Sequence, residues 1–443
     1  MKKIIYSLFI LVINISCSKF LDVNPKASIA GESVIVDETS AKAALNGVYS
    51  ALRDYYSVNY QSIGYLSGDN VEWTGSQSQI QEFINHNVKS ENSTISGTWS
   101  GIYRTINRAN SVIKSLNSIS SDIISNNVKN QVLGQALVIR ALAYFDLVRV
   151  WGGVPIITEP TDKVGQNIGI PRASAQETYK QVLDDLNQAE TLLGSTTDRF
   201  AITQKTVHAL KSRYYLYNKN WALAKEYATK LIGDSNYELA NPYYNFFVDN
   251  VVGTKESVFE LFYSANELNG HRGQWQPQNN GGTRQWAPNT QLIGLLTNPT
   301  TGGARSRLIA KDNQNRWYGN LYYRSPATDP TYILRIAELY LIRAEANAHL
   351  DQIENSKEDL NKIRNRAQLE PASFNTKEEA LIAIENERRL EFALEGHRWF
   401  DLVRTDRAKA VLGFTEDYKL LLPIPYSQIL ADPVLKQNPG YSL

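Results

Sequence analysis

The chain has 443 residues, of which 42% are hydrophobic and 21% are charged, and its formal net charge is +1 at pH 7. That length is enough to bury a large core, in one large domain or in about two or three smaller ones. Because the charges nearly cancel, there is no electrostatic reason to expect nucleic acid or an anionic membrane surface as the partner. The composition therefore favours a globular protein outside the nucleic-acid-binding classes.

The first residues have the anatomy of a signal peptide. Two lysines precede a mostly apolar run at 4–15, which is too short to span a bilayer as a mature helix. Cys17, the only cysteine, follows this run, and the residues leading to it resemble a bacterial lipoprotein signal except for Asn14. We predict a signal peptide at 1–16 and lipid attachment at Cys17. The alternative is an ordinary secretory signal with an incidental cysteine.

Helical spacing of apolar residues recurs in the first half of the chain. The stretches are 40–52, 99–118, 128–150, 174–193, 206–216 and 221–232. Thr39 or Ser40 is the expected N-cap of the first helix, and Ser174 with Glu177 has the spacing of a capping box. The segment 53–97 is polar and aromatic, and we expect a long functional loop there with little regular structure.

The second half begins with a segment that lacks sustained helical spacing, and helical spacing then returns. A short strand is expected at 258–263, the stretch 271–286 has no period, and a short helical piece lies near Leu292. Three further helices are predicted from apolar and small residues at helical spacing. They cover 332–347, 360–367 and 384–404.

The helix pairs suggest a repeat architecture that has lost its regularity. Repeated helix pairs build tetratricopeptide-type solenoids, but here the spacing between the pairs varies too much for a regular array. We therefore predict a mainly α-helical fold with a few tetratricopeptide-like pairs inside one body at 17–443. Its parts are an N-terminal helical half at 17–232, a loop-rich insertion at 255–330, and a C-terminal helical and tail region at 331–443.

Three carboxylates invite a catalytic interpretation. Glu387, Glu391 and Glu395 are spaced four residues apart on one predicted helix face, and paired carboxylates catalyse glycoside hydrolysis. However, arginines are interleaved with them, and apolar positions suggest that the helix packs on more than one side. We interpret the three acids as partners in structural ion pairs, and we read Arg335, Glu338 and Glu345 in the same way.

Metal and cofactor chemistry has no support in the sequence. The five histidines are scattered, and no two of them have metal-ligand spacing. Glu345 and His349 stand four apart on a predicted helix, but without a third ligand nearby they make a poor zinc site. A phosphate-binding glycine loop, a catalytic cysteine and a nucleophile-elbow serine are also lacking. We predict no metal, no cofactor and no catalytic residue.

The positive signal is aromatic. Tryptophans occur in four non-periodic segments beside amide or arginine side chains, a combination that suits a glycan because sugars have apolar C–H faces edged by hydroxyls. The predicted ligand-contacting residues are Asn70, Trp73, Trp275, Gln276, Arg284, Trp286, Trp317 and Tyr318. The alternative is that each ring packs its own loop onto the body. The other tryptophans are assigned to the core: Trp99, Trp151, Trp221 and Trp399.

Several segments, in order along nearly the whole mature chain, carry a family pattern. They are Phe20-Leu-Asp22, 99–110, 140–149, Gly153-Val-Pro155, 335–346, Ile363-Arg-Asn-Arg-Ala367, 387–404, Leu422-Pro-Ile-Pro425 and Gln437-Asn-Pro-Gly-Tyr441. Any one of them is weak, but together and at these separations they are specific. The chain resembles the SusD-like family, also called RagB/SusD, of nutrient-uptake outer-membrane lipoproteins.

The resemblance implies a non-enzymatic, lipid-anchored protein (palmitate on the acylated cysteine) that faces the cell exterior. It also implies that the protein sits as a lid on a SusC-like TonB-dependent transporter, captures oligosaccharide and passes it to the transporter for import. Its fold would be tetratricopeptide-like helix pairs supporting an irregular ligand-binding half. Two alternatives stay open: the same scaffold capturing peptide, and a secreted glycoside hydrolase.

Overall fold

The computed structural model describes residues 35–442, so the predicted signal peptide and Cys17 lie outside the described part of the chain. The fold is mainly α-helical, as predicted. The N-terminal elements are α2 (Glu38–Tyr55), α3 (Val58–Leu66), β1 (Val71–Trp73), α4 (Ser78–Ile84), α5 (Ser93–Ser118), α6 (Asn126–Trp151), α7 (Ala175–Leu192), α8 (Gln204–Tyr217) and α9 (Trp221–Ile232).

The middle of the chain contributes short strands and turns, and the C-terminal part returns to helices. The middle elements are the 3₁₀ turn η3 (Tyr243–Phe246), β2 (Ser257–Leu261), α10 (His271–Trp275), the 3₁₀ turn η4 (Gln278–Asn280), β3 (Trp286–Pro288), α11 (Thr290–Thr297), the 3₁₀ turn η5 (Gly303–Leu308), β4 (Ile309–Lys311), β5 (Trp317–Gly319) and β6 (Thr331–Arg335). The C-terminal elements are α12 (Ile336–His349), α13 (Ile353–Arg366), α14 (Lys377–Glu391), α15 (Arg398–Arg404), α16 (Ala408–Leu412), the 3₁₀ turn η6 (Asp417–Leu420) and α17 (Tyr426–Ala431).

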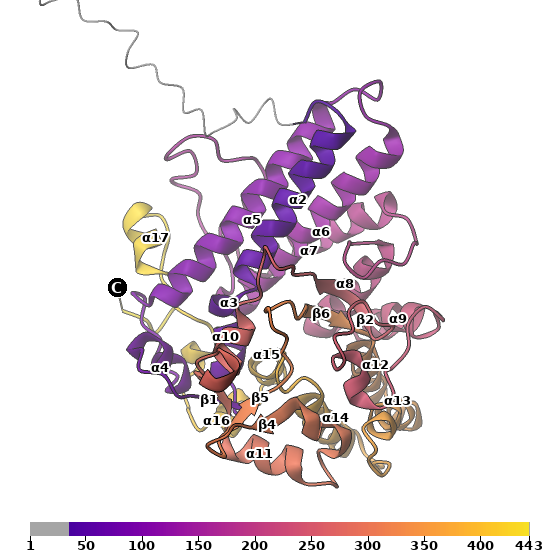
Figure 1. Cartoon of the computed structure of the whole chain (residues 1–443). Helices are drawn as coiled ribbons and strands as arrows, with labels where there is room; N and C mark the ends of the chain where they lie inside the picture. Colours follow the sequence, from indigo (N-terminus) through magenta and orange to yellow (C-terminus); the bar gives the residue numbers. More distant parts are fainter. Residues whose placement is uncertain (1–34, 443) are drawn as a thin grey trace, which may run out of the picture.

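Two groups of helices form the scaffold. Helices α2, α5, α6 and α7 run side by side in the upper part of Figure 1, and α12 packs against α8, α9, α13 and α14 in the lower part. The main hydrophobic core, from Ile35 to Ile424, includes residues of both groups, and a second, smaller cluster lies among α12, α13 and α14. Helix α6 is apolar and long enough to cross a membrane, but 89% of its apolar window is buried inside the protein, where it packs between α5 and α7.

The helix ends show how local sequence sets the boundaries. Ser174 caps α7, and its hydroxyl and the Glu177 carboxylate exchange hydrogen bonds with each other's backbone, which confirms the predicted capping box. For α2 the predicted cap is wrong. Asp37 is the N-cap, and Ser40 lies three residues later as its partner in the box. The Asp37 carboxylate accepts the hydrogen bond from the Ser40 backbone N–H, so the cap is a carboxylate and not the predicted hydroxyl.

Several predicted segments differ from the structure. The segment 53–97 is not a loop, because α3, β1 and α4 lie within it and α5 begins at Ser93. The predicted helix at 332–347 begins as strand β6, which pairs with β2. The predicted helix at 384–404 is split into α14 and α15 at 392–397, where Gly396 adopts φ +70°.

The four helix-associated tryptophans do not behave alike. Trp99, Trp151 and Trp399 are buried, which confirms their assignment to the core. Trp221 is half-buried and stacks on His349 with ring centroids 3.8 Å apart. His349 is therefore a packing partner at the end of α12.

Candidate ligand-binding site

The four non-periodic tryptophan segments converge in space. Strand β1 pairs antiparallel with β3, which places Trp73 opposite Trp286, and β3 lies beside β5. The Thr74 amide donates to the Gln285 carbonyl at 2.9 Å, and Arg284 Nε donates to the Trp317 carbonyl at 2.7 Å. Segments that are more than 200 residues apart in sequence thus form one corner of the molecule.

The floor of this corner is a buried aromatic cluster. Trp275 and Trp286 are fully buried with ring centroids 5.6 Å apart, and Tyr65 of α3 lies 5.3 and 5.0 Å from the two rings. Gln276 is also buried, and its amide donates to the Gly319 and Tyr322 carbonyls. Trp275, Gln276 and Trp286 were predicted to face a ligand, but they are buried. Trp286 lies on strand β3, which pairs with β1, and Trp275 lies on α10, which packs against β3.

Asn70 and the neighbouring Asp69 anchor this corner to the scaffold. The Asn70 side chain accepts from Arg389 Nε at 2.8 Å and donates to the Arg389 carbonyl at 3.1 Å. Asp69 pairs with Arg389 at 3.0 Å and with Arg398 at 2.6 Å. Asn70 is 2% exposed, so it holds the loop against α14 and does not face a ligand.

The remaining predicted residues lie closer to the surface. Trp73 and Trp317 are half-buried, and the Lys311 ammonium lies 4.8 Å from the centre of the Trp317 ring. Tyr318 is 9% exposed. Arg284 is half-buried, and burial together with the nearby Arg316 lowers its pKa. Trp73, Trp317 and Arg284 are the predicted residues that this corner leaves accessible.

A cavity of about 340 Å³ opens beside Trp73. Its size is within the ordinary range for small-molecule sites. Its lining carries hydroxyl, amide and apolar side chains and no charged one. The lining residues are Val58, Asn59, Ser62, Trp73, Gln77, Gln79, Ile80, Ser93, Thr94, Gln274 and Gln285. We call this cavity the Trp73 pocket.

The Trp73 ring packs closely against the backbone at Gly75. A Cβ atom added to Gly75 would lie 2.3 Å from the ring edge, so only glycine lets the chain pass so close. The indole N–H is buried and has no hydrogen-bond partner in the described structure. The glutamine side chains of the pocket likewise make no hydrogen bond to another group among the described residues.

Sequence reasoning missed most of the amide residues around the pocket. Gln77 and Gln79 were not predicted to contact a ligand, and neither was Asn59 on α3. The one usable signal was the density of glutamine and serine at 76–79 beside a tryptophan. Asn59 gave no signal, because α3 itself was not predicted.

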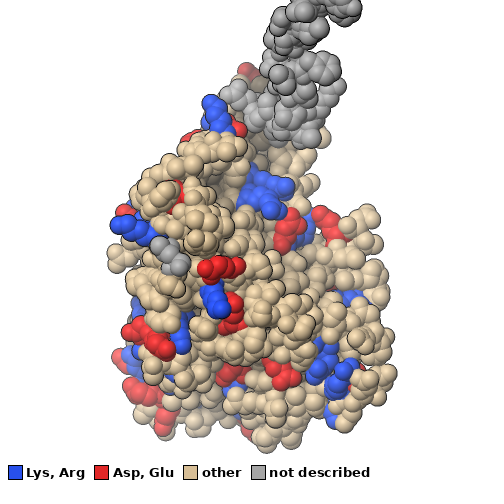
Figure 2. All heavy atoms as spheres, turned by 90° about the vertical axis from the view of Figure 1, so that its left-hand side faces the viewer, with Lys and Arg blue, Asp and Glu red and all other residues tan. Residues whose placement is uncertain are grey.

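The face that carries α4 and α17 is poor in charge. Figure 2 shows this side of the molecule, where Lys, Arg, Asp and Glu occur in small scattered groups on a largely uncharged surface. Such a surface suits a neutral ligand better than a polyanion.

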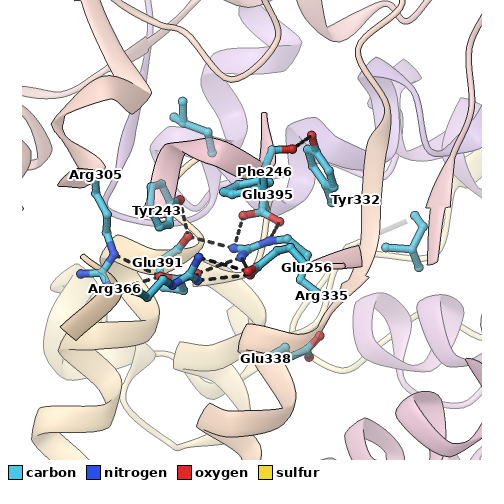
Figure 3. A network of polar contacts seen from close by, with 12 residues as sticks. Tyr243, Phe246, Glu256, Arg305, Tyr332, Arg335, Glu338, Arg366, Glu391 and Glu395 are labelled. Atoms are coloured by element: carbon cyan, nitrogen blue, oxygen red, sulfur yellow. Dashed lines mark hydrogen bonds and ion pairs between the residues drawn. The ribbon is translucent and has the colours of Figure 1, made fainter. Parts of the chain in front are cut away.

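Glu387 and Glu391 lie at the end of α14, but Glu395 lies in the break after it, so the three acids do not share one helix face as predicted; they form an ion-pair network (Figure 3). Glu391 is fully buried and accepts from Arg335 Nη1 at 2.8 Å and from Arg305 Nε at 3.1 Å, and it also pairs with Arg366. Glu395 accepts from Arg335 at 2.6 and 2.9 Å. The side-chain pairing thus agrees with the structural interpretation of these acids.

Electrostatics within the network keep Glu391 ionised. Burial raises the pKa of Glu391, but Arg366, Arg335 and Arg305 together outweigh it, so the pKa lies below its ordinary value. A general acid for glycoside hydrolysis needs a raised pKa and access to the glycosidic oxygen. Glu391 has neither property.

The other predicted ion pairs are formed as well. Glu338 accepts from Arg213 at 2.8 and 2.5 Å, and Glu345 accepts from Arg404 at 2.5 and 2.8 Å. Both pairs are buried and bidentate, the geometry in which arginine holds a carboxylate most firmly. They join α8 to α12 and α12 to α15.

Comparison with known proteins decides the family. Residues 19–216 match a family model described as starch-binding associating with outer membrane, and residues 239–416 match the model of the SusD family. The chain belongs to the SusD/RagB family. This confirms the resemblance found in the sequence.

Relatives of this SusD-like chain match it along almost their full length. The SusD-like protein P38 of Formosa agariphila is 29% identical over 96% of each chain. A SusD superfamily protein of Bacteroides thetaiotaomicron has a solved structure with a TM-score of 0.80, 26% identity, and coverage of 91% of this chain and 100% of its own. A laminarin-binding SusD-like protein gives a TM-score of 0.82 at 25% identity, with coverage of 92% and 100%.

Proposed function

We propose that this protein binds a neutral oligosaccharide at the Trp73 pocket and delivers it to a membrane transporter. The carrying observation is the pocket itself, in which Trp73 lies among uncharged amide and hydroxyl side chains, and its four glutamine side chains make no hydrogen bond to another group among the described residues. The laminarin-binding relative supports a glycan as the ligand class.

The chemistry of the pocket matches the two surfaces of a sugar. The C–H face of a pyranose ring packs on an indole, while its edge hydroxyls need both donors and acceptors. Each glutamine amide offers both, and the four glutamines reach the pocket from three segments: Gln77 and Gln79 at the start of α4, Gln274 on α10 and Gln285 beside β3. A site without charge binds a neutral glycan without leaving a buried ion unpaired.

The proposed setting follows from the family. We propose that Cys17 is acylated, that the protein is anchored to the outer membrane facing the exterior, and that a SusC-like TonB-dependent transporter receives the ligand. The protein acts by binding, and it is not proposed to be an enzyme, because Glu387, Glu391 and Glu395 are all paired with buried arginines.

The test is a binding measurement with matched tryptophan variants. Isothermal titration of the protein with laminarin and a panel of other neutral polysaccharides should identify at least one ligand. Trp73→Ala should then lower the affinity about tenfold or more, equivalent to about 1.4 kcal/mol. Trp221→Ala, which removes a half-buried ring on α9 away from the pocket, should leave the affinity unchanged.

Two outcomes contradict the proposal. Equal affinity in the Trp73→Ala variant and the unmodified protein rules out this pocket as the site. Binding of peptides but of no glycan in a parallel peptide panel assigns the pocket to peptide capture, since amide side chains also pair with peptide backbones.

A further inference from the structure

A second and larger cavity lies on the same side of the molecule as the Trp73 pocket. It encloses about 560 Å³ between α5, the segment 155–170, and the chain at and after α17. Its lining is mainly apolar and includes Tyr103 and Ile106 of α5, Ile168, and Leu435. We call it the α5–α17 cavity.

The rim of the α5–α17 cavity is unusually apolar for a surface. Val164 and Ile168 both line the cavity, and Val164 is fully exposed while Ile168 is 61% exposed. The Gly169 amide donates to Asp432 Oδ2 at 2.8 Å, which ties the loop on one side of the cavity to the chain on the other. Exposed apolar side chains that border a formed cavity mark a binding site more often than an isolated exposed residue does.

The two cavities open onto one short stretch of α5. Ser93 and Thr94 of α5 line the Trp73 pocket, and Trp99 and Ser100 of the same helix line the α5–α17 cavity. Ser93 and Ser100 are seven residues apart. Because the helix rises about 1.5 Å per residue, the two sets of lining residues are separated by about two turns, or about 10 Å.

The exposed residues of α5 between the two cavities have small side chains. Ser93, Gly97 and Ser100 are exposed and carry small or no side chains. In Figure 1, α4, α5 and α17 lie on the same side of the molecule, the side that Figure 2 presents as largely uncharged. A chain-like ligand leaving the Trp73 pocket along α5 meets the α5–α17 cavity without crossing a bulky or charged side chain of this stretch.

We infer that the Trp73 pocket and the α5–α17 cavity are two subsites of one extended site for a linear oligosaccharide. One end of the glycan packs on Trp73, its middle crosses the stretch 93–100, and a distal sugar places its apolar C–H face in the α5–α17 cavity. This inference rests on the proposed function of the Trp73 pocket. It adds that affinity depends on the length of the glycan.

The experiment compares a short and a long probe on surface variants. Laminaritriose and laminariheptaose are titrated into the unmodified protein and into Val164→Asp and Ser100→Tyr, which place a charge at the rim and a bulky ring between the subsites. Ile123→Asp and Ser118→Tyr are matched controls at exposed positions outside both cavities. Melting temperatures establish that all variants fold.

The expected result is a length effect that the variants remove. The heptasaccharide should bind the unmodified protein and both controls about tenfold more tightly than the trisaccharide, or about 1.4 kcal/mol. In Val164→Asp and Ser100→Tyr this difference should vanish, while the affinity for the trisaccharide stays the same.

Other results overturn the inference in distinguishable ways. Equal affinity for the two probes in the unmodified protein, or a length effect that survives both variants, shows that the α5–α17 cavity is not a subsite while the Trp73 pocket stands. Loss of trisaccharide binding in folded Val164→Asp places the short probe elsewhere. If neither probe binds at all, the proposed function fails for this glycan and the extended site falls with it.

Discussion

Arg335 and Glu391 show what single side chains contribute to this fold. Arg335, the last residue of β6, contacts Glu256 at 2.8 Å, Glu391 at 2.8 Å and Glu395 at 2.6 Å. Removing such charges from water is unfavourable, so the network is stable only while every member keeps its partners. Its geometric effect is to fix where strand β6 meets the end of α14.

Replacing Glu391 with glutamine tests this at the scale of one residue. Glu391→Gln keeps the shape but leaves the arginines around it without a buried counter-charge, and we expect a loss of about 3–5 kcal/mol in the free energy of unfolding. Urea denaturation followed by circular dichroism measures it.

Glu354→Gln is the matched control for Glu391→Gln. Glu354 pairs with Lys357, but its side chain is 78% exposed, so its replacement should change stability by no more than about 0.5 kcal/mol. Similar unfolding midpoints for the two variants would show that the buried network does not stabilise the fold as described.

At the scale of elements, two helical glycines on α2 and α3 have opposite surroundings. A Cβ atom on Gly64 of α3 would lie 2.5 Å from the Gly396 carbonyl oxygen, a backbone atom in the break between α14 and α15. A Cβ atom on Gly47 of α2 would meet nothing within 4 Å. Gly64 therefore lets α3 pack directly on the break between α14 and α15. No neighbouring atom requires a glycine at position 47.

The two alanine substitutions should therefore differ in sign. Gly47→Ala should stabilise the protein by about 0.5–1 kcal/mol, because alanine is the better helix former. Gly64→Ala should destabilise it by about 1–3 kcal/mol, because the added methyl group forces backbone apart. Thermal denaturation of both variants beside the unmodified protein decides this, and a stabilising Gly64→Ala would contradict the close contact.

Prediction from sequence succeeded where local chemistry sets the structure. The capping box at Ser174 and the long apolar stripes of α5 and α6 are local signals, and these elements were found. Helix α3 was missed because its residues, such as Tyr60 and Gln61, are buried by tertiary contacts. Its amino-acid composition gives no sign of these contacts. The burial of Trp275 and Trp286 was missed for the same reason, since it depends on the pairing of β3 with β1 and on the packing of α10 against β3.

At the scale of the whole molecule, buried titratable groups predict the response to acid. Burial lowers the pKa of His271 and His397 to about 3, from an ordinary value of 6.5. Burial raises the pKa of Glu338, but Arg213 outweighs it and the pKa falls to about 2. In all three groups the unfolded chain binds a proton at a higher pH than the folded protein does.

The stability that these three groups contribute is fully present above pH 6.5. The histidine contribution is lost as the pH falls from 6.5 toward about 3, and the Glu338 contribution is lost from 4.5 toward about 2. Burial raises the pKa of Asp329 to about 6, so this one group contributes with the opposite sign in the same range. Because the two histidines outweigh it, urea midpoints should decrease overall from about pH 7 to about pH 4.

The variant His271→Gln separates the histidine contribution. Glutamine does not titrate, so this variant should show a shallower decrease over the same range, whatever its stability at neutral pH. A midpoint that is constant between neutral and mildly acidic pH in the unmodified protein would contradict the buried neutral state of these histidines.

The buried aromatic floor beneath the Trp73 pocket has a practical consequence for protein engineering. Tyr65, Trp275 and Trp286 pack against one another in the interior of this corner, whereas Gln77 is exposed and Gln274 is half-buried. Under the proposed function, a library randomised at Gln77 and Gln274 would sample new sugar preferences with little change in folding stability. The chain would then be a scaffold for selecting glycan-detection reagents, in which the binding residues are exchanged and the buried aromatic residues are kept.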